Sequence, residues 1–204
     1  DMDPAETGWL MEIDNLLATK PTDPKLDAVL YFLLERGWLD LGCIIFSQLY
    51  DSVLWLGLHL SKRMSDEKIG VYANATKSGI IEKGEFRRVN RDEVKKRITT
   101  GELRLVIGTD AASEGLNLQR LGSLINLDLP WNPTRLEQRK GRIQRIGQLR
   151  PEVLIYNMRY VGSVEDRVHQ LLSERLVNIR NMFGQIPDTL EDVWVAAALK
   201  DEEE

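Results

Sequence analysis

The chain has 204 residues and a formal net charge of −5, with 43% hydrophobic and 29% charged residues, as expected of a soluble globular protein with one domain plus appendages or two small domains. No apolar run approaches the ~20 residues of a bilayer span, no signal-peptide pattern stands at the first residues, and the single cysteine excludes a disulfide framework or a cysteine metal site within this chain. Because it begins Asp1-Met2, we expect a segment of a longer protein.

The cysteine is predicted to be structural, and the two histidines are predicted to be structural or surface residues. Cys43 lies in the apolar run CIIF, which favours a buried small side chain over a catalytic thiol. His59 and His169 lie in helical patterns far apart in sequence. We expect no metal site, and a reducing, cytoplasmic location that would be nucleoid-associated in a bacterium.

Apolar periodicity and capping residues predict helices that alternate with short apolar strands. Asp3-Pro4 and Asp23-Pro24 mark helix starts, and Asn90 with Glu93 suggests a capping box. The predicted helices are 3–19, 24–36, 53–64, 90–101, 132–146, 163–183 and 189–199. The predicted strands are 41–48, 68–72, 103–107, 124–127 and 153–156. Residues 73–89 lack periodicity and are expected to form a loop or a poorly ordered hairpin.

Strands of four to six nearly all-apolar residues indicate a parallel sheet covered on both faces, an α/β three-layer fold. In such sheets, the loops after the carboxyl ends of the strands form the site. The loops that begin with Ser47-Gln48, Thr109-Asp110 and Asp128 should therefore converge on one edge.

The stretch TDAASEGLNLQ at 109–119 has the chemistry of a phosphate-proximal loop. The Thr109 hydroxyl and free backbone N–H groups can hold a phosphate oxygen, and Gly115 allows a close backbone approach. A carboxylate such as Asp110 or Glu114 cannot hold phosphate and would orient an arginine or a sugar hydroxyl instead. The alternative is a plain strand-to-helix turn.

The stretch QRKGRIQRIGQ at 138–148 forms the core of a basic segment, because residues 134–150 hold six basic residues and one acid. Arg139, Arg142 and Arg145 recur every three residues, so Arg142 and Arg145 should share a helix face with Gln138 nearby. Paired guanidinium groups suit phosphate recognition, and Gly141 would let another chain or a ligand approach. The alternative is a solvated basic helix surface.

Two features of a complete ATPase are missing from the sequence. There is no GxxxxGK[ST] phosphate loop, and no Asp-Glu pair follows an apolar strand in the manner of a magnesium-binding motif. The chain thus has arginines suited to a γ-phosphate without a cradle for the nucleotide. We expect no measurable ATP hydrolysis by this chain alone.

At these residues the chain resembles the C-terminal RecA-like lobe (helicase conserved C-terminal domain) of superfamily-two helicases, in the Swi/Snf-like and RapA-like branch. IIFSQ at 44–48 looks like motif IV, and TDAASEGLNLQ looks like motif V. DLPWNP at 128–133 leads into QRKGRIQRIGQ, which looks like motif VI, and GSVEDRV at 162–168 looks like the helix start that follows it. Motifs V and VI together at this spacing are highly specific.

The resemblance covers roughly residues 24–183 and implies a RecA-like fold of the P-loop NTPase type. It implies ATP with magnesium as cofactor, both held mainly by a separate N-terminal RecA-like lobe, and a DNA backbone partner bound independently of sequence, with RNA left open and no membrane. The implied catalytic residues are Arg142 and Arg145, as arginine fingers, with Gln138. The implied cofactor-binding residues are Glu114, Gly115 and Asp110. The implied nucleic-acid-binding residues are Ser47, Gln48, Thr109 and Asn117.

The implied division is an N-terminal helical segment or linker at 1–22, the lobe at 23–160, and a C-terminal helical extension with an acidic tail at 161–204. The chain departs from the family at 73–89, which replaces a shorter segment and carries Lys77, Lys83, Arg87 and Arg88. These residues either contact nucleic acid or belong to a mobile insert. The overall alternative is a catalytically silent lobe that serves as a protein- or nucleic-acid-binding module.

Overall fold

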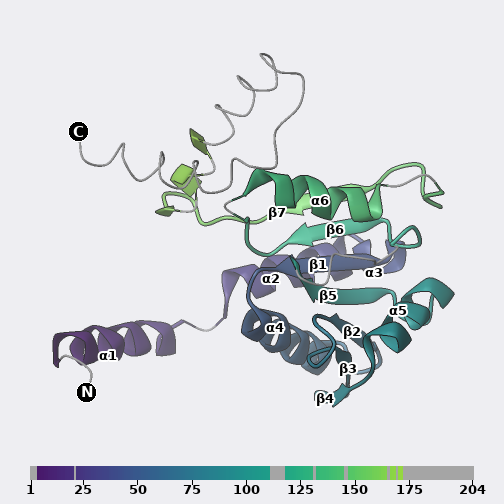
Figure 1. Cartoon of the computed structure of the whole chain (residues 1–204). Coiled ribbons are helices and arrows are strands. Elements are labelled where there is room, and N and C mark those ends of the chain that lie inside the picture. The colour runs from purple at the N-terminus through teal and green to yellow at the C-terminus, as the bar shows by residue number, and fades with distance from the viewer. Residues whose placement is uncertain are drawn as a thin grey trace.

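Seven strands form one sheet in the order β4-β3-β2-β5-β1-β6-β7 (Figure 1). The computed structural model describes residues 4–20, 22–110, 118–130, 132–144, 147–164, 166–168 and 170–171. The strands are β1 Cys43–Ser47, β2 Ile69–Tyr72, β3 Gly79–Glu82, β4 Glu85–Arg88, β5 Leu105–Thr109, β6 Ser123–Asn126 and β7 Leu154–Asn157. Strands β2, β5, β1, β6 and β7 are parallel, and β3 and β4 are antiparallel to their neighbours.

The sheet is covered on both faces, which confirms the predicted three-layer RecA-like α/β fold. Because side chains alternate along a strand, Cys43 and Ile45 of β1 lie in one hydrophobic cluster and Ile44 and Phe46 in the other. The first cluster packs under α2, α3 and α4, and the second under α5 and α6. Cys43 is fully buried, as predicted, and burial raises the pKa of its thiol to about 12.

The helices follow the predicted order. They are α1 Pro4–Ala18, α2 Pro24–Leu30 with the π-helical turn η1 Tyr31–Glu35, α3 Trp38–Leu41, α4 Tyr50–Arg63, α5 Arg91–Thr100 and α6 Pro133–Ile143. Asp23 caps α2 through its side chain, and Asn90 caps α5 by accepting from the Asp92 backbone N–H. Glu93 does not complete a capping box in the expected way, because its carboxylate binds Arg97. The four-residue helix α3 was not predicted.

Strand β5 begins two residues later than predicted. The backbone N–H groups of Glu102 and Leu103 donate to the Arg97 carbonyl at 2.9 and 3.1 Å, so both are occupied in closing the end of α5. Leu103 is buried without joining the sheet. The shift brings Thr109 into β5, where it lies in register with Ser47 of β1.

Within the predicted loop or poorly ordered hairpin at 73–89, residues 79–88 form a hairpin that extends the sheet, whereas 73–78 form a loop. The hairpin interpretation is thus confirmed for 79–88, where the expected poor order is not seen. The turn residues Lys83 and Gly84 have φ of 51° and 80°, as in a type I′ turn, whose twist matches a hairpin. Strand β4 is polar and exposed except at Phe86, which packs on the core side facing α4. Its exposed charges suit an edge strand.

Gly79 is predicted to be required for this hairpin. A Cβ atom there would lie 2.4 Å from both the Arg87 carbonyl oxygen and the Phe86 ring, so Gly79→Ala forces the two strands apart. We expect this variant to lose about 1–3 kcal/mol of unfolding free energy in urea titrations. Gly8→Ala in α1, where a Cβ meets no atom within 4 Å, should cause no loss. Equal stability of the two variants would contradict this packing account.

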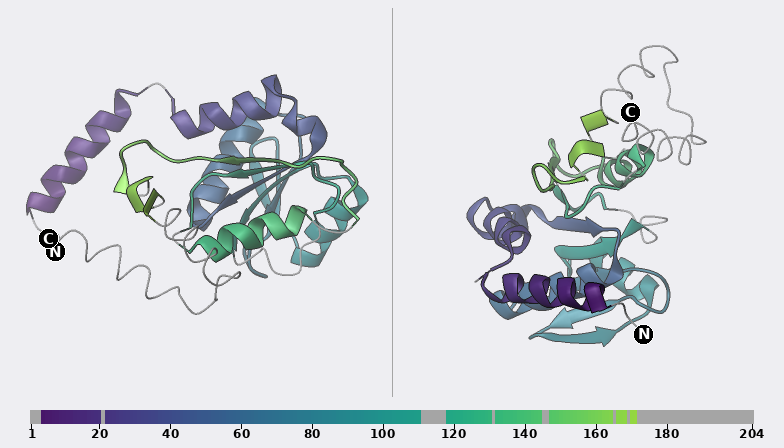
Figure 2. Two further views of the ribbon diagram at one scale, coloured as in Figure 1. Left: turned by 90° about the horizontal axis from the view of Figure 1, so that it is seen from above. Right: turned by 90° about the vertical axis from the view of Figure 1, so that its left-hand side faces the viewer.

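Helix α1 stands apart from the sheet in Figure 1 and in the left view of Figure 2. It exposes a stripe of large apolar side chains: Trp9, Leu10, Ile13, Leu16 and Leu17. None of the described helices is long and apolar enough to cross a membrane. Ser163 accepts a hydrogen bond from the Asp166 backbone N–H at 3.1 Å, as expected of a helix cap. Most of the predicted helix 163–183, the helix 189–199 and His169 lie outside the described residues, and the domain division stays a prediction.

Candidate nucleotide and nucleic-acid interface

The polar residues that follow the parallel strands meet at the carboxyl edge of the sheet, as the sequence predicted. Ser47 and Thr109 end neighbouring strands in register, and the chain after β6 brings Asp128 to the same place. The Ser47 hydroxyl donates to the Asp128 carboxylate, and the Gln48 backbone N–H donates to its two oxygens at 2.9 and 3.1 Å. Asp128 therefore fixes the loop between β1 and α4.

The two motif IV residues differ in accessibility at this edge. Ser47 is fully buried and its hydroxyl is engaged by Asp128. Gln48 is exposed, and its side-chain nitrogen Nε2 donates a hydrogen bond to the Leu129 carbonyl oxygen at 3.1 Å. Gln48 is thus the residue of the pair that a partner can reach directly. Thr109 is 7% exposed and lies deeper in the edge.

The largest fully buried side chain in the described part of the chain is Arg139 of α6, whose role the sequence did not reveal. Its Nε and Nη2 donate to the two Asp110 oxygens at 2.5 and 2.8 Å. Its Nη1 donates to Asn126 Oδ1 at 2.8 Å and to the Asp128 carbonyl oxygen at 3.0 Å, and the guanidinium lies over the Phe46 ring. Arg139 thereby joins α6 to β5, β6 and β1.

Asp110 is therefore an arginine-orienting carboxylate, the first of the two roles that its chemistry suggested. Its side chain is 16% exposed, and both oxygens face Arg139. The network continues outward, because the Asn126 amide donates to Asn157 Oδ1 at 2.7 Å. A buried carboxylate and a buried guanidinium are tolerated because each satisfies the hydrogen bonds of the other.

Helix α6 packs one side against the sheet, and the predicted catalytic residues Gln138 and Arg142 lie on its other side. Leu136, Arg139 and Ile143 are buried at helical spacing, whereas Gln138 is exposed and Arg142 is half-buried. Gln138 and Arg142 are four residues apart and so lie on one side of the helix. A Cβ at Gly141 would meet no atom within 4 Å, which leaves that side open to an approaching molecule. Gln148 caps the helix end by donating to the Ile143 carbonyl at 2.8 Å.

Several predicted site residues lie outside the described residues. They are Glu114, Gly115, Asn117 and Arg145. Within the described ranges, no group of three or more His, Cys, Asp and Glu side chains is arranged to hold a metal ion. The site as described therefore comprises Gln48, Thr109, Asp110, Gln138 and Arg142 around the Arg139 network.

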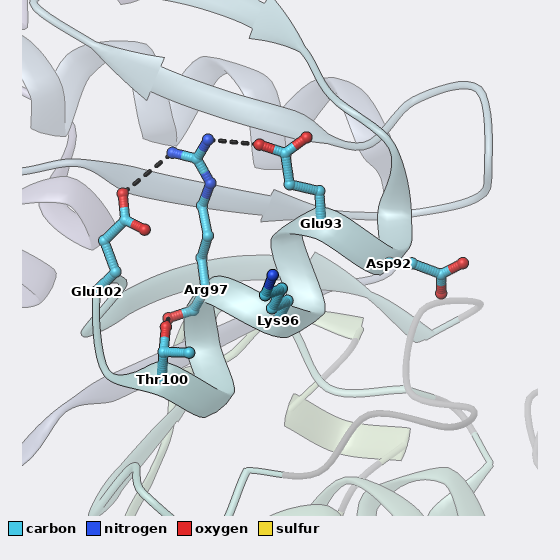
Figure 3. A pocket seen from close by; sticks show the side chains of 6 residues that line it. All are labelled: Asp92, Glu93, Lys96, Arg97, Thr100 and Glu102. Atoms are coloured by element: carbon cyan, nitrogen blue, oxygen red, sulfur yellow. Dashed lines mark hydrogen bonds and ion pairs between the residues drawn. The ribbon is translucent and has the colours of Figure 1, made fainter.

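A shallow surface hollow on α5 is separate from this site (Figure 3). Arg97 forms ion pairs there with Glu93 and, at 3.0 Å, with Glu102. Because these charges neutralise one another at the surface and no motif residue lines the hollow, it has the features of a solvated helix face.

Comparison with known proteins identifies the family. Residues 42–147, about half of the chain, match the model of the helicase conserved C-terminal domain. An ATP-dependent helicase of Bacillus subtilis, YqhH, is 42% identical over 118 residues, covering 58% of this chain and 21% of YqhH. The RNA polymerase-associated protein RapA of Vibrio atlanticus is 50% identical over 50 residues, covering 24% of this chain and 5% of RapA.

A solved structure, the C-terminal part of the Fun30 ATPase domain, shares the fold with a TM-score of 0.55 at 19% identity. The match covers 87% of this chain and 52% of the Fun30 chain. The chain thus spans about a fifth or less of the curated relatives named above and about half of the solved one. It belongs to the helicase conserved C-terminal domain family, as a C-terminal RecA-like lobe of the Swi/Snf-like branch of superfamily-two helicases.

Proposed function

We propose that this chain is the second motor lobe of an ATP-dependent DNA translocase or helicase, which supplies arginine fingers and nucleic-acid-backbone contacts and is inactive as an ATPase alone. The observation that carries the proposal is the geometry of α6. Arg139 anchors the helix through a buried network, and Arg142 and Gln138 lie on its outward side beside an open Gly141. A guanidinium on the outward side of an anchored helix suits a ligand that is held by another protein surface.

The residues present fit the phosphate end of ATP and no more. Arg142 and Arg145 would contact the γ-phosphate, and Gln138 would order the interface around them. Asp110 would act through Arg139, to which it is hydrogen-bonded, and the motif implies that Glu114 and Gly115 would line the nucleotide side of the same segment. ATP bound with magnesium on the N-terminal lobe would supply the phosphoanhydride bond whose hydrolysis drives the motor. The sequence lacks the phosphate loop that would hold the nucleotide itself.

The nucleic-acid side of the proposal lies at the ends of β1 and β5. Gln48 would contact the backbone of the tracked strand directly, with Asn117, while Ser47 and Thr109 hold the loop and strand end from which these contacts are made. Such contacts go to phosphates and carry no sequence information. Closure of the two lobes around ATP and reopening after hydrolysis would alternate the grip on the strand.

The test is to compare this chain with a two-lobe protein in which it follows an N-terminal RecA-like lobe from the same protein. We expect the chain alone to show no ATP turnover, and the two-lobe protein to show turnover that rises on addition of duplex DNA. Steady-state phosphate release measures both. A two-lobe protein that never hydrolyses ATP, with or without DNA, would contradict the motor function and favour a silent binding module.

A further inference from the structure

The base of the β3–β4 hairpin carries a group of side chains that the family resemblance does not account for, which we call the hairpin patch: Tyr50, Lys77 and Arg88. The Lys77 ammonium lies 4.6 Å from the centre of the Tyr50 ring, in a cation–π contact. Burial raises the pKa of Tyr50, the nearby positive charge of Arg88 opposes that rise, and Asp51 adds to it. The patch therefore joins the start of α4, the loop after β2 and the end of β4.

The cations of the hairpin patch differ from several other basic residues of the surface, which are paired with carboxylates. Lys68, Arg97, Arg104 and Lys140 each form an ion pair with a carboxylate. In the part of the chain that the structure describes, no ion pair engages Lys77 or Arg88. Lys77 and Arg88 are also exposed. Uncompensated positive charge gathered on a protein with net charge −5 marks a place for an anionic partner.

The patch adjoins the nucleic-acid edge of the site. Arg88 pairs with Gly79 at the open end of the hairpin, and Tyr50 follows Gln48 by two residues. Lys83, by contrast, lies at the turn joining Glu82 to Glu85, at the other end of the hairpin. The four basic residues of this segment therefore do not act as one group, and only those at the open end continue the edge on which Gln48 lies.

We propose that the hairpin patch is an additional binding surface for nucleic-acid backbone phosphates, specific to this hairpin. The ring of Tyr50 holds Lys77 in place, and Arg88 offers a planar fork of donors to a neighbouring phosphate. The inference deepens the proposed function and rests on it for the choice of nucleic acid over an acidic protein. The hairpin would lengthen the track of backbone that the lobe grips beyond Gln48.

The test measures binding of the 204-residue chain to a fluorescein-labelled DNA duplex by anisotropy across a range of KCl concentrations. Each lost phosphate contact lowers the slope of log affinity against log salt by about 0.9. We expect Lys77→Gln combined with Arg88→Gln to lower that slope by about 2 and to weaken binding by about tenfold or more near 0.1 M salt.

The matched control removes the same charge at the opposite edge, with Lys68→Gln and Lys83→Asn. Asparagine suits the positive φ of residue 83, and this variant should keep the wild-type slope. Equal effects of the two double variants, no effect of either, or no binding by the wild-type chain would each overturn the inference. Equal displacement of the labelled duplex by polyglutamate and by unlabelled DNA would also overturn it, since the surface would then bind polyanions without a preference for nucleic acid. ATP turnover of the two-lobe protein tests the motor function separately, because patch binding needs no hydrolysis.

Discussion

Arg142→Ala in the two-lobe protein is expected to lower DNA-stimulated ATP turnover by about 10³–10⁵-fold, the range typical of an arginine finger. The physical reason is that Arg142 would stabilise charge that develops on the transferred phosphoryl group, and water in a vacated site is a poor substitute for a fixed guanidinium. Arg145→Ala should cause a loss of the same order, on the basis of the sequence motif. Turnover is measured by phosphate release at saturating DNA.

The control for this prediction lies on the same helix. Lys140 is two residues from Arg142, and its ammonium binds Glu137 at 2.6 Å on the exposed surface. Lys140→Ala removes the same charge from α6 and should leave turnover within about twofold, because surface ion pairs contribute little. Arg142→Lys keeps the charge but loses the planar fork of donors, so we expect only partial recovery. Unchanged turnover in Arg142→Ala with intact folding would refute the finger role.

The sequence predicted the part of the fold that depends on short apolar runs. Strands such as CIIFS and LVIGT are buried on both faces, so their composition alone indicates a covered parallel sheet and places their polar ends together. The hairpin was harder to predict because β4, EFRR, is an edge strand with one apolar contact at Phe86. Its pairing comes from β3 and from a turn whose Lys-Gly sequence is a weak signal.

The sequence predicted which residues gather at the site, but it did not predict the role of each one. Spacing shows that Arg139, Arg142 and Arg145 recur along a helix, but it does not show which of them turns inward. That choice depends on Asp110 and Asn126, which reach Arg139 from strands that are distant in sequence. Leu136 and Ile143, which are buried beside Arg139, were the available indication that this side of α6 faces the sheet. The Ser47 hydroxyl likewise donates a hydrogen bond to Asp128, a residue that is far from it in sequence and near it only in the folded chain.

Arg139→Met is expected to lower the unfolding free energy of the chain by about 3–5 kcal/mol, because it removes the guanidinium that pairs with the largely buried Asp110 carboxylate. Asp110→Asn in the same chain should recover much of that loss, since of the two carboxylates beside Arg139 only Asp128, 3.7 Å from it, then keeps its charge. Urea unfolding followed by circular dichroism measures each variant, and the double-mutant cycle isolates the pair. A double variant less stable than the wild-type chain by the sum of the two single losses would contradict the pairing.

The control for this prediction is Arg104, which makes as many hydrogen bonds as Arg139 but is much more exposed. It therefore separates the effect of burial from that of the number of hydrogen bonds. Arg104 also makes four hydrogen bonds to polar groups, three to Glu67 and one to Asp40, but its side chain is 46% exposed where that of Arg139 is 1% exposed. Water solvates the half-exposed guanidinium of Arg104 and does not reach that of Arg139, so Arg104→Ala should cost at most about 1 kcal/mol. If the two arginines cost the same, the number of bonds and not desolvation would govern the loss. If Arg139 dominates, the buried network is what holds α6, and with it Arg142, against the sheet.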